Sequence, residues 1–257
     1  MASQRGGESA ELAEARAIEL RKATPAVCYP DPGSRLCREL LEELEEAGVT
    51  HYVNAGRIRL PGGYQLLGRG WAGNVFLAIW RGRVAAVKAL HPQSRRSTIL
   101  WEAAAWAAAA WLGAAPRLYT AGRLYLVADA VLGPRLDEVN EIGCGAARHL
   151  IRRLIWKAYR LDRLGLRHGE LARPGGQVLI DEKSLEPYIV DYDSSTLSRK
   201  PGNLTQLLAG LRRLSLTRRC TRLSGSGEEL REALRSYKQA PTLESLERVL
   251  SALGLDP

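Results

Sequence analysis

Cysteine is scarce in this chain, and its four copies are dispersed among 257 residues. The cysteines form no C-x-x-C pair, and no histidine is placed to complete a zinc set; they are Cys28, Cys37, Cys144 and Cys220. A structural zinc site needs clustered thiolate or imidazole ligands, so this spacing excludes the usual zinc motifs. We therefore expect buried or inert thiols, rather than metal ligands or disulfide bonds.

Long apolar segments are also missing. The most apolar stretch, residues 103–115, is shorter than a bilayer span, and the polar residues 1–9 lack the apolar region of a secretory signal. Methionine and phenylalanine occur once each, a composition compatible with a thermophilic or high-GC source. Hydrophobic residues make up 46% of the chain and charged residues 25%, which is ordinary for a globular protein. We expect a soluble, cytoplasmic protein that does not enter membranes.

A glycine-rich turn is the most informative feature that is present. Three glycines and a valine follow the pattern G-x-G-x-x-G-x-V, at Gly68, Gly70, Gly73 and Val75. Glycine lets backbone N–H groups approach anionic phosphates. The dinucleotide-binding pattern would open a helix, whereas residues 75–80 continue as a strand, turn at Arg81-Gly82 and return over residues 83–90. The sequence predicts a hairpin that covers phosphates, with Lys88 on the return strand.

Two further segments follow this hairpin. Residues 99–106 are strongly helical, and Glu102 is the only acid among them. Residues 123–133 predict a strand that leads into a connection, with Asp129 and Val131 near its end. The order so far is glycine-rich hairpin, strand lysine, helix glutamate and a last strand.

The second half of the chain has two acid-bearing segments. The first is Leu166-Arg167-His168-Gly169-Glu170-Leu171, between a predicted helix and the predicted strand 177–180. The second is the strand Pro187-Tyr188-Ile189-Val190, which ends at Asp191. Turn residues 181–184 between two apolar runs predict a hairpin in the gap. We expect His168 to form structural hydrogen bonds in its loop.

This order of elements resembles the protein-kinase fold, in its small atypical branch. The chain is similar to the RIO kinases and to the small kinase of the tRNA-modifying KEOPS complex, and most similar to an archaeal group of predicted serine/threonine kinases. Over residues 50 to 215 the likeness rests on His168-Gly169-Glu170-Leu171-Ala172-Arg173-Pro174, on Asp191-Tyr192-Asp193-Ser194 and on Arg199-Lys200-Pro201. The resemblance implies an α+β, two-lobed, kinase-like fold: a five-stranded antiparallel N-lobe sheet with one main helix, and a reduced helical C-lobe without a conventional activation segment.

The same resemblance implies the division of the chain and the role of each residue. Residues 1–50 would be an N-terminal helical extension, 51–131 the N-lobe and 132–257 the C-lobe. ATP would be bound by Gly68, Gly70, Gly73, Val75, Lys88, Glu102, Asp129 and Val131, with Lys88 fixed by Glu102. Asp191 and Gln177 would hold Mg²⁺, and Glu170 would orient the acceptor hydroxyl; Glu170, Lys88 and Asp191 form the catalytic set.

Three departures from the family pattern leave alternatives open. Glu170 stands where aspartate is usual, and its longer side chain shifts the carboxylate. Gly175 stands where the family has a metal-binding asparagine, so Gln177 is the candidate for that metal ligand. No A-P-E segment follows Asp191. A serine/threonine protein kinase that also phosphorylates itself is the preferred interpretation. An ATPase switch on RNA or ribosomal particles, a small-molecule kinase and a nucleotide-binding pseudokinase remain alternatives.

The flanking segments supply the remaining predictions. Residues 10–24 and 34–47 predict two amphipathic helices, separated by a Pro- and Gly-rich break at 29–33, and residues 203–214, 227–238 and 242–253 predict closing helices. The net charge is +9, and basic side chains gather in two clusters, which makes RNA a candidate partner. One cluster lies on a predicted helix and contains Arg148, Arg152, Arg153, Lys157 and Arg160; the other contains Arg212, Arg213, Arg218, Arg219 and Arg222. Solvated surface is the alternative for both groups. A polar loop is also expected to hold Ser194, Ser195, Thr196 and Ser198, with phosphorylation as its alternative.

Overall fold

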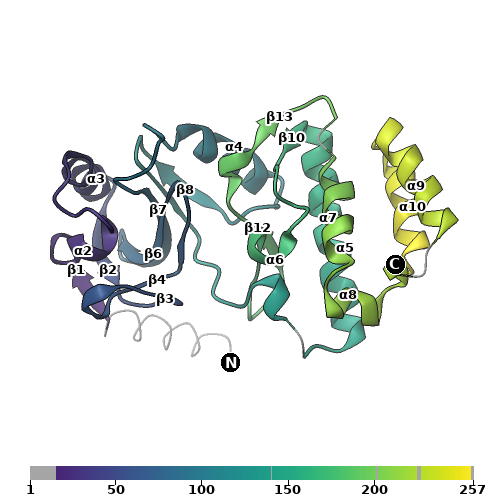
Figure 1. Ribbon diagram of the computed structural model, residues 1–257, viewed down its shortest axis with the longest axis horizontal. Helices are drawn as coiled ribbons and strands as arrows, with labels where there is room; N and C mark the ends of the chain where they lie inside the picture. Colours follow the sequence, from purple (N-terminus) through teal and green to yellow (C-terminus); the bar gives the residue numbers. More distant parts are fainter. Residues whose placement is uncertain (1–15, 140, 201, 225–226, 256–257) are drawn as a thin grey trace. The chain divides into compact units, whose positions relative to one another are not determined.

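The computed structural model describes residues 16–139, 141–200, 202–224 and 227–255 (Figure 1). They form a mixed α+β protein whose strand pairings are antiparallel. The chain divides into two compact units. Unit 1 contains the residues up to Ala104 together with Arg117–Ala130, and unit 2 contains Ala105–Pro116 and the residues from Val131 onward.

Unit 1 is built around a sheet of seven strands (Figure 1). Across the sheet lie β1 (Ala17–Glu19), β2 (Val49–Val53), β6 (Gly73–Trp80), β7 (Arg83–Leu90), β9 (Tyr125–Ala128) and β8 (Leu118–Ala121), while β5 (Gly68–Arg69) pairs with β6. A separate pair joins β3 (Ile58–Arg59) to β4 (Gln65–Leu66). The helical elements are η1 (Leu20–Ala23), α2 (Thr24–Val27), α3 (Arg35–Glu46), η2 (Pro61–Gly63) and the start of α4 (Leu100–Trp111). The prediction of five strands was wrong, because residues 17–53 add β1 and β2.

The central hairpin of this sheet forms as predicted. Strands β6 and β7 pair from Gly73 opposite Leu90 to Trp80 opposite Arg83. The two residues between them have positive φ angles, 47° at Arg81 and 75° at Gly82. Paired positive φ angles are typical of the two-residue turn that matches strand twist. The long, unbroken register places Lys88 directly opposite Val75.

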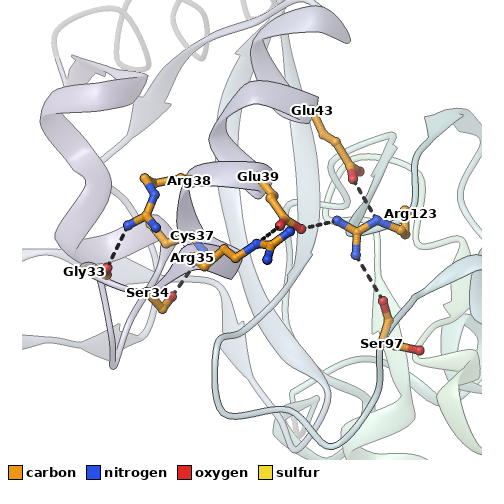
Figure 2. Close-up of polar contacts among 9 residues, drawn as sticks. All are labelled: Gly33, Ser34, Arg35, Cys37, Arg38, Glu39, Glu43, Ser97 and Arg123. Carbon is orange, nitrogen blue, oxygen red and sulfur yellow. Dashed lines mark hydrogen bonds and ion pairs between the residues drawn. The ribbon is translucent and has the colours of Figure 1, made fainter.

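Helix α3 packs into the core of unit 1. Ser34 caps its first turn, accepting a hydrogen bond from the backbone N–H of Cys37 at 3.1 Å (Figure 2). Buried Leu40 and Leu44 belong to the same apolar core as residues of the sheet. On its polar side, Glu39 accepts from Arg123 at 2.5 Å, which ties the helix to the β8–β9 turn (Figure 2). Residues 35–46 therefore form part of unit 1 and not a separate extension, and the boundary predicted at residue 51 falls inside β2.

The first predicted helix differs from the observed structure. Residues 10–15 of that prediction lie outside the described residues, and the rest fold as β1, η1 and α2. Ala17–Glu19 gains ladder hydrogen bonds by pairing with β2, from Ala17 opposite Val53 to Glu19 opposite His51. Pro25 stands in the first turn of α2, where a missing N–H is tolerated. Strand pairing here outweighs the helical periodicity of the sequence.

Unit 2 is mainly helical. Its longest helix, α5 (Cys144–Leu164), ends at Gly165 in a left-handed conformation and buries the predicted stripe that includes Ile151, Leu154 and Leu161. The other helical elements are residues 105–111 of α4, η3 (Leu136–Glu138), α6 (Pro174–Gln177), η4 (Tyr192–Ser194), α7 (Asn203–Leu211), α8 (Ser215–Cys220), η5 (Arg222–Ser224), α9 (Glu228–Gln239) and α10 (Leu243–Ala252). Two short antiparallel pairs join β10 (Leu166–Arg167) to β13 (Thr196–Leu197), and β11 (Val178–Ile180) to β12 (Pro187–Ile189). Within the described part of the chain, no helix is both long and apolar enough to cross a membrane.

The cysteines overturn the prediction of free thiols, because all four are paired. Cys28 and Cys37 form a disulfide in unit 1 with Cα atoms 5.5 Å apart, and Cys144 and Cys220 form one in unit 2 with Cα atoms 5.0 Å apart. The second joins α5 to α8 across 76 residues, a proximity that spacing in the sequence does not reveal. Disulfides persist in oxidising compartments and in the intracellular proteins of hyperthermophiles. A cytoplasmic location stays a prediction, and two disulfides fit such a location in a hyperthermophile.

Candidate functional site

The glycine-rich turn of unit 1 is a tight hairpin. Gly68 pairs with Val75, and the N–H of Gly70 donates to the carbonyl of Gly73 at 3.0 Å. A Cβ at Gly73 would lie 2.3 Å from the carbonyl oxygen of Ala89, so β7 approaches too closely for a side chain there. A Cβ at Gly70 would meet no atom within 4 Å. Glycine is thus required by packing at Gly73, while the space beside Gly70 is empty.

A buried ion pair lies on the next strand. Lys88 of β7 and Glu102 of α4 meet with Nζ and Oε1 2.5 Å apart. The two side chains are 9% and 0% exposed. The start of α4 is held by the N–H of Ile99, which donates to the carbonyl of Arg123 in the β8–β9 turn at 2.9 Å. A buried pair of this kind contributes little net stability, since desolvation offsets the attraction, so its main effect is to orient the ammonium group.

Asp129 and Val131, which were predicted to bind ATP, fall in different units. Asp129 belongs to unit 1, where its carboxylate accepts a hydrogen bond from the hydroxyl of Tyr119 and its N–H donates to the carbonyl of Arg117. The hydrogen bond from Tyr119 raises the pKa of the Tyr119 phenol, because it favours the protonated form. Val131 begins the long segment of unit 2. The Asp129 side chain is thus hydrogen-bonded within unit 1. Only its backbone carbonyl would be available to the adenine base of a bound ATP.

His168 is the structural centre of the acid-bearing loop in unit 2. Its ring is fully buried, with Nε2 2.9 Å from the carbonyl of Val190 and Nδ1 accepting from the N–H of Glu170 at 3.3 Å. Burial lowers its pKa, which favours the neutral ring with the proton on Nε2. The structural role predicted for His168 is therefore confirmed, and it fixes the loop against the end of β12.

Glu170 is half-buried, and both of its carboxylate oxygens accept hydrogen bonds. Its Oε2 accepts from Nε2 of Gln177 at 2.7 Å, and its Oε1 accepts from the hydroxyl of Ser194 at 2.8 Å. Gln177 ends α6, and Ser194 ends η4 just after Asp191. Two residues predicted for the site, Glu170 and Gln177, are thus in direct contact, and Ser194 joins them.

Asp191 follows β12 in a conformation that is uncommon for residues other than glycine. Its φ angle of 67° is left-handed, which costs free energy for any residue other than glycine and is enriched at functional sites. The backbone places it next to Gln177, since the N–H of Val190 donates to the Gln177 carbonyl at 2.9 Å. The negative charges of Asp191, Glu170 and Asp193 each raise the pKa of His168, against the larger lowering that burial causes.

The donor set around Gln177 fits a magnesium ion that is shared with a polyphosphate. Its Oε1 is buried without a hydrogen-bond partner, while its Nε2 is used by Glu170. An amide oxygen without a partner beside a carboxylate suits Mg²⁺, which takes one or two protein carboxylates and completes its shell with phosphate and water. Among the described residues, no group of three or more histidine, cysteine, aspartate or glutamate side chains could hold a metal ion.

A buried polar network that was not predicted anchors the loop. The carboxylate of Asp162 on α5 accepts from the backbone and side chain of Asn203, at 2.7 and 2.9 Å, and from the hydroxyl of Tyr237 at 2.8 Å. Asn203 in turn accepts from the N–H of His168 and donates to the carbonyl of Leu166. Burial raises the pKa of Asp162, and these hydrogen bonds oppose the rise. The residues are distant in sequence, so no spacing signal could have found them.

The basic face predicted on α5 is largely engaged within unit 2. Four of its five members make intramolecular contacts: Arg148 with the carbonyl of Cys220, Arg153 and Lys157 with Glu186, and Arg160 with the carbonyl of Leu112. Lys157 is buried, which contradicts its assignment to a solvated or RNA-facing surface. RNA binding stays a prediction that rests on net charge and on the arginines around Cys220.

No protein-family model matches this chain, and neither does any curated protein. The kinase resemblance therefore depends on the motifs and on the contacts described above.

Proposed function

We propose that this protein transfers the γ-phosphoryl group of ATP, with Mg²⁺, to a serine or threonine hydroxyl of a protein, itself included, and that its fold is an atypical kinase fold. The buried ion pair between Lys88 and Glu102, next to a glycine-rich hairpin, carries the proposal. A lysine kept in one orientation at 2.5 Å from a fully buried carboxylate is suited to binding phosphate oxygens.

Unit 1 would hold the nucleotide. The open space beside Gly70 would leave room for the phosphates, and Gly73 lets the hairpin pack tightly against β7. Val75 lies opposite Lys88 in the sheet, so the two residues occupy one face of the sheet. Such a face offers an apolar surface beside a cation, which a nucleoside triphosphate requires.

Unit 2 would supply the groups that act on the metal and the acceptor. Asp191 and the amide oxygen of Gln177 would hold Mg²⁺, which neutralises phosphate charge when bound. Glu170, oriented by Gln177, would accept the proton of the attacking hydroxyl. Most of the rate gain in phosphoryl transfer comes from such positioning and charge neutralisation.

The test is incubation with γ-labelled ATP and Mg²⁺, following labelled protein and free phosphate separately. Wild type is compared with Asp191→Ala and Glu170→Ala, and with Glu182→Ala as a matched control that removes an exposed acid from the β11–β12 turn. Labelled protein that is lost in the first two variants and kept in the control supports the proposal. Retained labelling in Asp191→Ala contradicts it. Free phosphate without labelled protein indicates an ATPase, and nucleotide binding without either product indicates a scaffold.

A further inference from the structure

The hydroxyl of Ser194 occupies an unusual position beside the carboxylate of Glu170. Its Oγ donates to Oε1 of Glu170 at 2.8 Å and lies 3.0 Å from Oδ1 of Asp193. A serine hydroxyl has one proton to donate and two lone pairs. With that proton directed at a carboxylate, a lone pair of the oxygen is available for attack. Ser194 is also exposed, so a reactant can reach it.

The carboxylate that receives this proton is itself oriented. Gln177 donates to the other oxygen of Glu170 at 2.7 Å. Ser194 is thus hydrogen-bonded to a base, Glu170, whose carboxylate is oriented by Gln177. This is the arrangement that identifies activated hydroxyl nucleophiles in general.

The backbone holds the two segments in register. Gly169 has a φ angle of +95°, and a Cβ there would lie 2.7 Å from the carbonyl oxygen of Ser194, so only glycine allows this approach. The rings of His168 and Tyr192, one on each segment, pack with centroids 4.9 Å apart. The close approach at Gly169 and the packing of His168 on Tyr192 therefore hold Glu170 and Ser194 in contact.

Neighbouring hydroxyls are placed differently. Ser195 is buried, and its hydroxyl donates to the carbonyl of Tyr192 at 2.6 Å. The Oγ of Ser198 accepts from the N–H of Lys200 at 3.1 Å. Thr196 is exposed on β13. Ser194 combines exposure with a hydrogen bond to an oriented carboxylate.

We propose that Ser194 is an internal phosphoryl acceptor, modified within its own chain with Glu170 as the base; this rests on the phosphoryl-transfer function proposed above. Oγ of Ser194 forms a bond to the γ-phosphorus of ATP, and the bond from that phosphorus to the β,γ-bridging oxygen breaks. ADP leaves with the electron pair, and the hydroxyl proton passes to Glu170 and then to water. The products are phosphoserine and ADP.

The experiment uses the full chain with ATP and Mg²⁺, maps phosphopeptides by mass spectrometry and measures ADP in parallel. Ser194→Ala is compared with Thr196→Val, which removes an exposed hydroxyl two residues away but keeps a β-branched side chain on the strand. We expect phosphate on Ser194 in wild type and in Thr196→Val, with complete loss of that site in Ser194→Ala. Glu170→Gln should slow modification of Ser194 by about 10²–10⁴-fold, the usual contribution of a general base. The rate constant should not change on dilution, because base and acceptor belong to one chain.

Each remaining outcome separates the two proposals. If wild type forms ADP or labels an added protein such as casein, and Ser194 carries no phosphate, the phosphoryl-transfer function stands and Ser194 is not the acceptor. If the rate of modification rises in proportion to protein concentration, transfer occurs between chains and the proposal is overturned. If ATP is not consumed, both proposals are wrong.

Discussion

Each unit of this protein contains a buried lysine paired with a glutamate, and the two pairs differ in their surroundings. In unit 1, Lys88 meets Glu102 at 2.5 Å beside a hairpin with open glycine backbone. In unit 2, Lys157 meets Glu186 at 2.6 Å, and the same glutamate also pairs with Arg153. Burial lowers the pKa of Lys157, while Glu186 opposes that shift.

The contacts of Lys157 explain why it is structural. Its Nζ donates to the carbonyl of Gly113 and lies 4.6 Å from the ring centroid of Tyr188, in addition to its pairing with Glu186. These contacts join α5 to the segment after α4 and to β12, all within unit 2. A buried lysine is therefore not by itself a sign of chemistry. The glycine-rich hairpin and the strand register distinguish Lys88.

The largest expected effect is on phosphoryl transfer. Lys88→Met should reduce labelling from γ-labelled ATP by at least about 10²-fold, because one oriented charge that stabilises the reacting phosphates is lost. Lys157→Met should keep activity within a few-fold at temperatures where the variant is folded, as verified by circular dichroism. Equal loss of activity in a folded Lys157→Met variant would remove the distinction between the two lysines.

The disulfides extend the comparison to stability. Replacing Cys144 and Cys220 with serine should lower the free energy of unfolding by about 4.5 kcal/mol, and replacing Cys28 and Cys37 by about 2.6 kcal/mol, because closing a longer loop restricts the unfolded chain more. The loops span 76 and 9 residues. Urea unfolding of the two double variants measures both values. The reverse order would mean that chain entropy does not govern these bonds.

A third variant separates orientation from stability in unit 1. Lys88→Met/Glu102→Leu replaces the buried pair with apolar side chains, and such replacements are neutral or stabilise by about 1–4 kcal/mol. We expect unfolding at the wild-type urea midpoint or above it, together with loss of labelling. Lys88→Met alone should unfold earlier than the double variant, since it leaves Glu102 buried. A double variant less stable than either single variant would show that the pair is a net source of stability.

The smallest expected effect is the pH response of the loop in unit 2. Burial lowers the pKa of His168 below its ordinary value of 6.5. Below pH 6.5, His168 is therefore protonated in the unfolded chain but stays neutral in the folded chain. Stability should then fall on acidification from pH 7 to pH 5, with a slope of at most about 1.4 kcal/mol per pH unit. His168→Asn should lack this component in urea titrations at the two pH values. Identical pH dependence in both proteins would contradict a neutral, buried His168.

Much of the candidate site could be predicted from local patterns. The strands on either side of Arg81-Gly82, the helix that carries Glu102 and the loop around Glu170 each have a short-range signal, and each was found where expected. The contact of Lys88 with Glu102 was implied by the resemblance to kinases and is present in the structure. These predictions succeed because periodicity and turn residues act over a few positions.

The missed features depend on residues that are far apart in sequence. Strand β1 exists because β2 offers it a partner, and Cys144 meets Cys220 only once α5 and α8 pack. Lys157 has helical spacing typical of a surface position, yet Glu186 and Tyr188 cover it. Local propensity carries no information about such neighbours.

The sequence alone determined the hairpin and the main helices, because each depends on backbone preferences within one element, and its motifs supplied the resemblance from which the candidate chemistry was inferred. Tertiary structure alone decided which lysine is enclosed by other groups, that Asn203 and Asp162 anchor the His168 loop, and that Ser194 donates to Glu170. The physical reason is that burial, desolvation and hydrogen-bond geometry are set by neighbours brought together only when the chain folds.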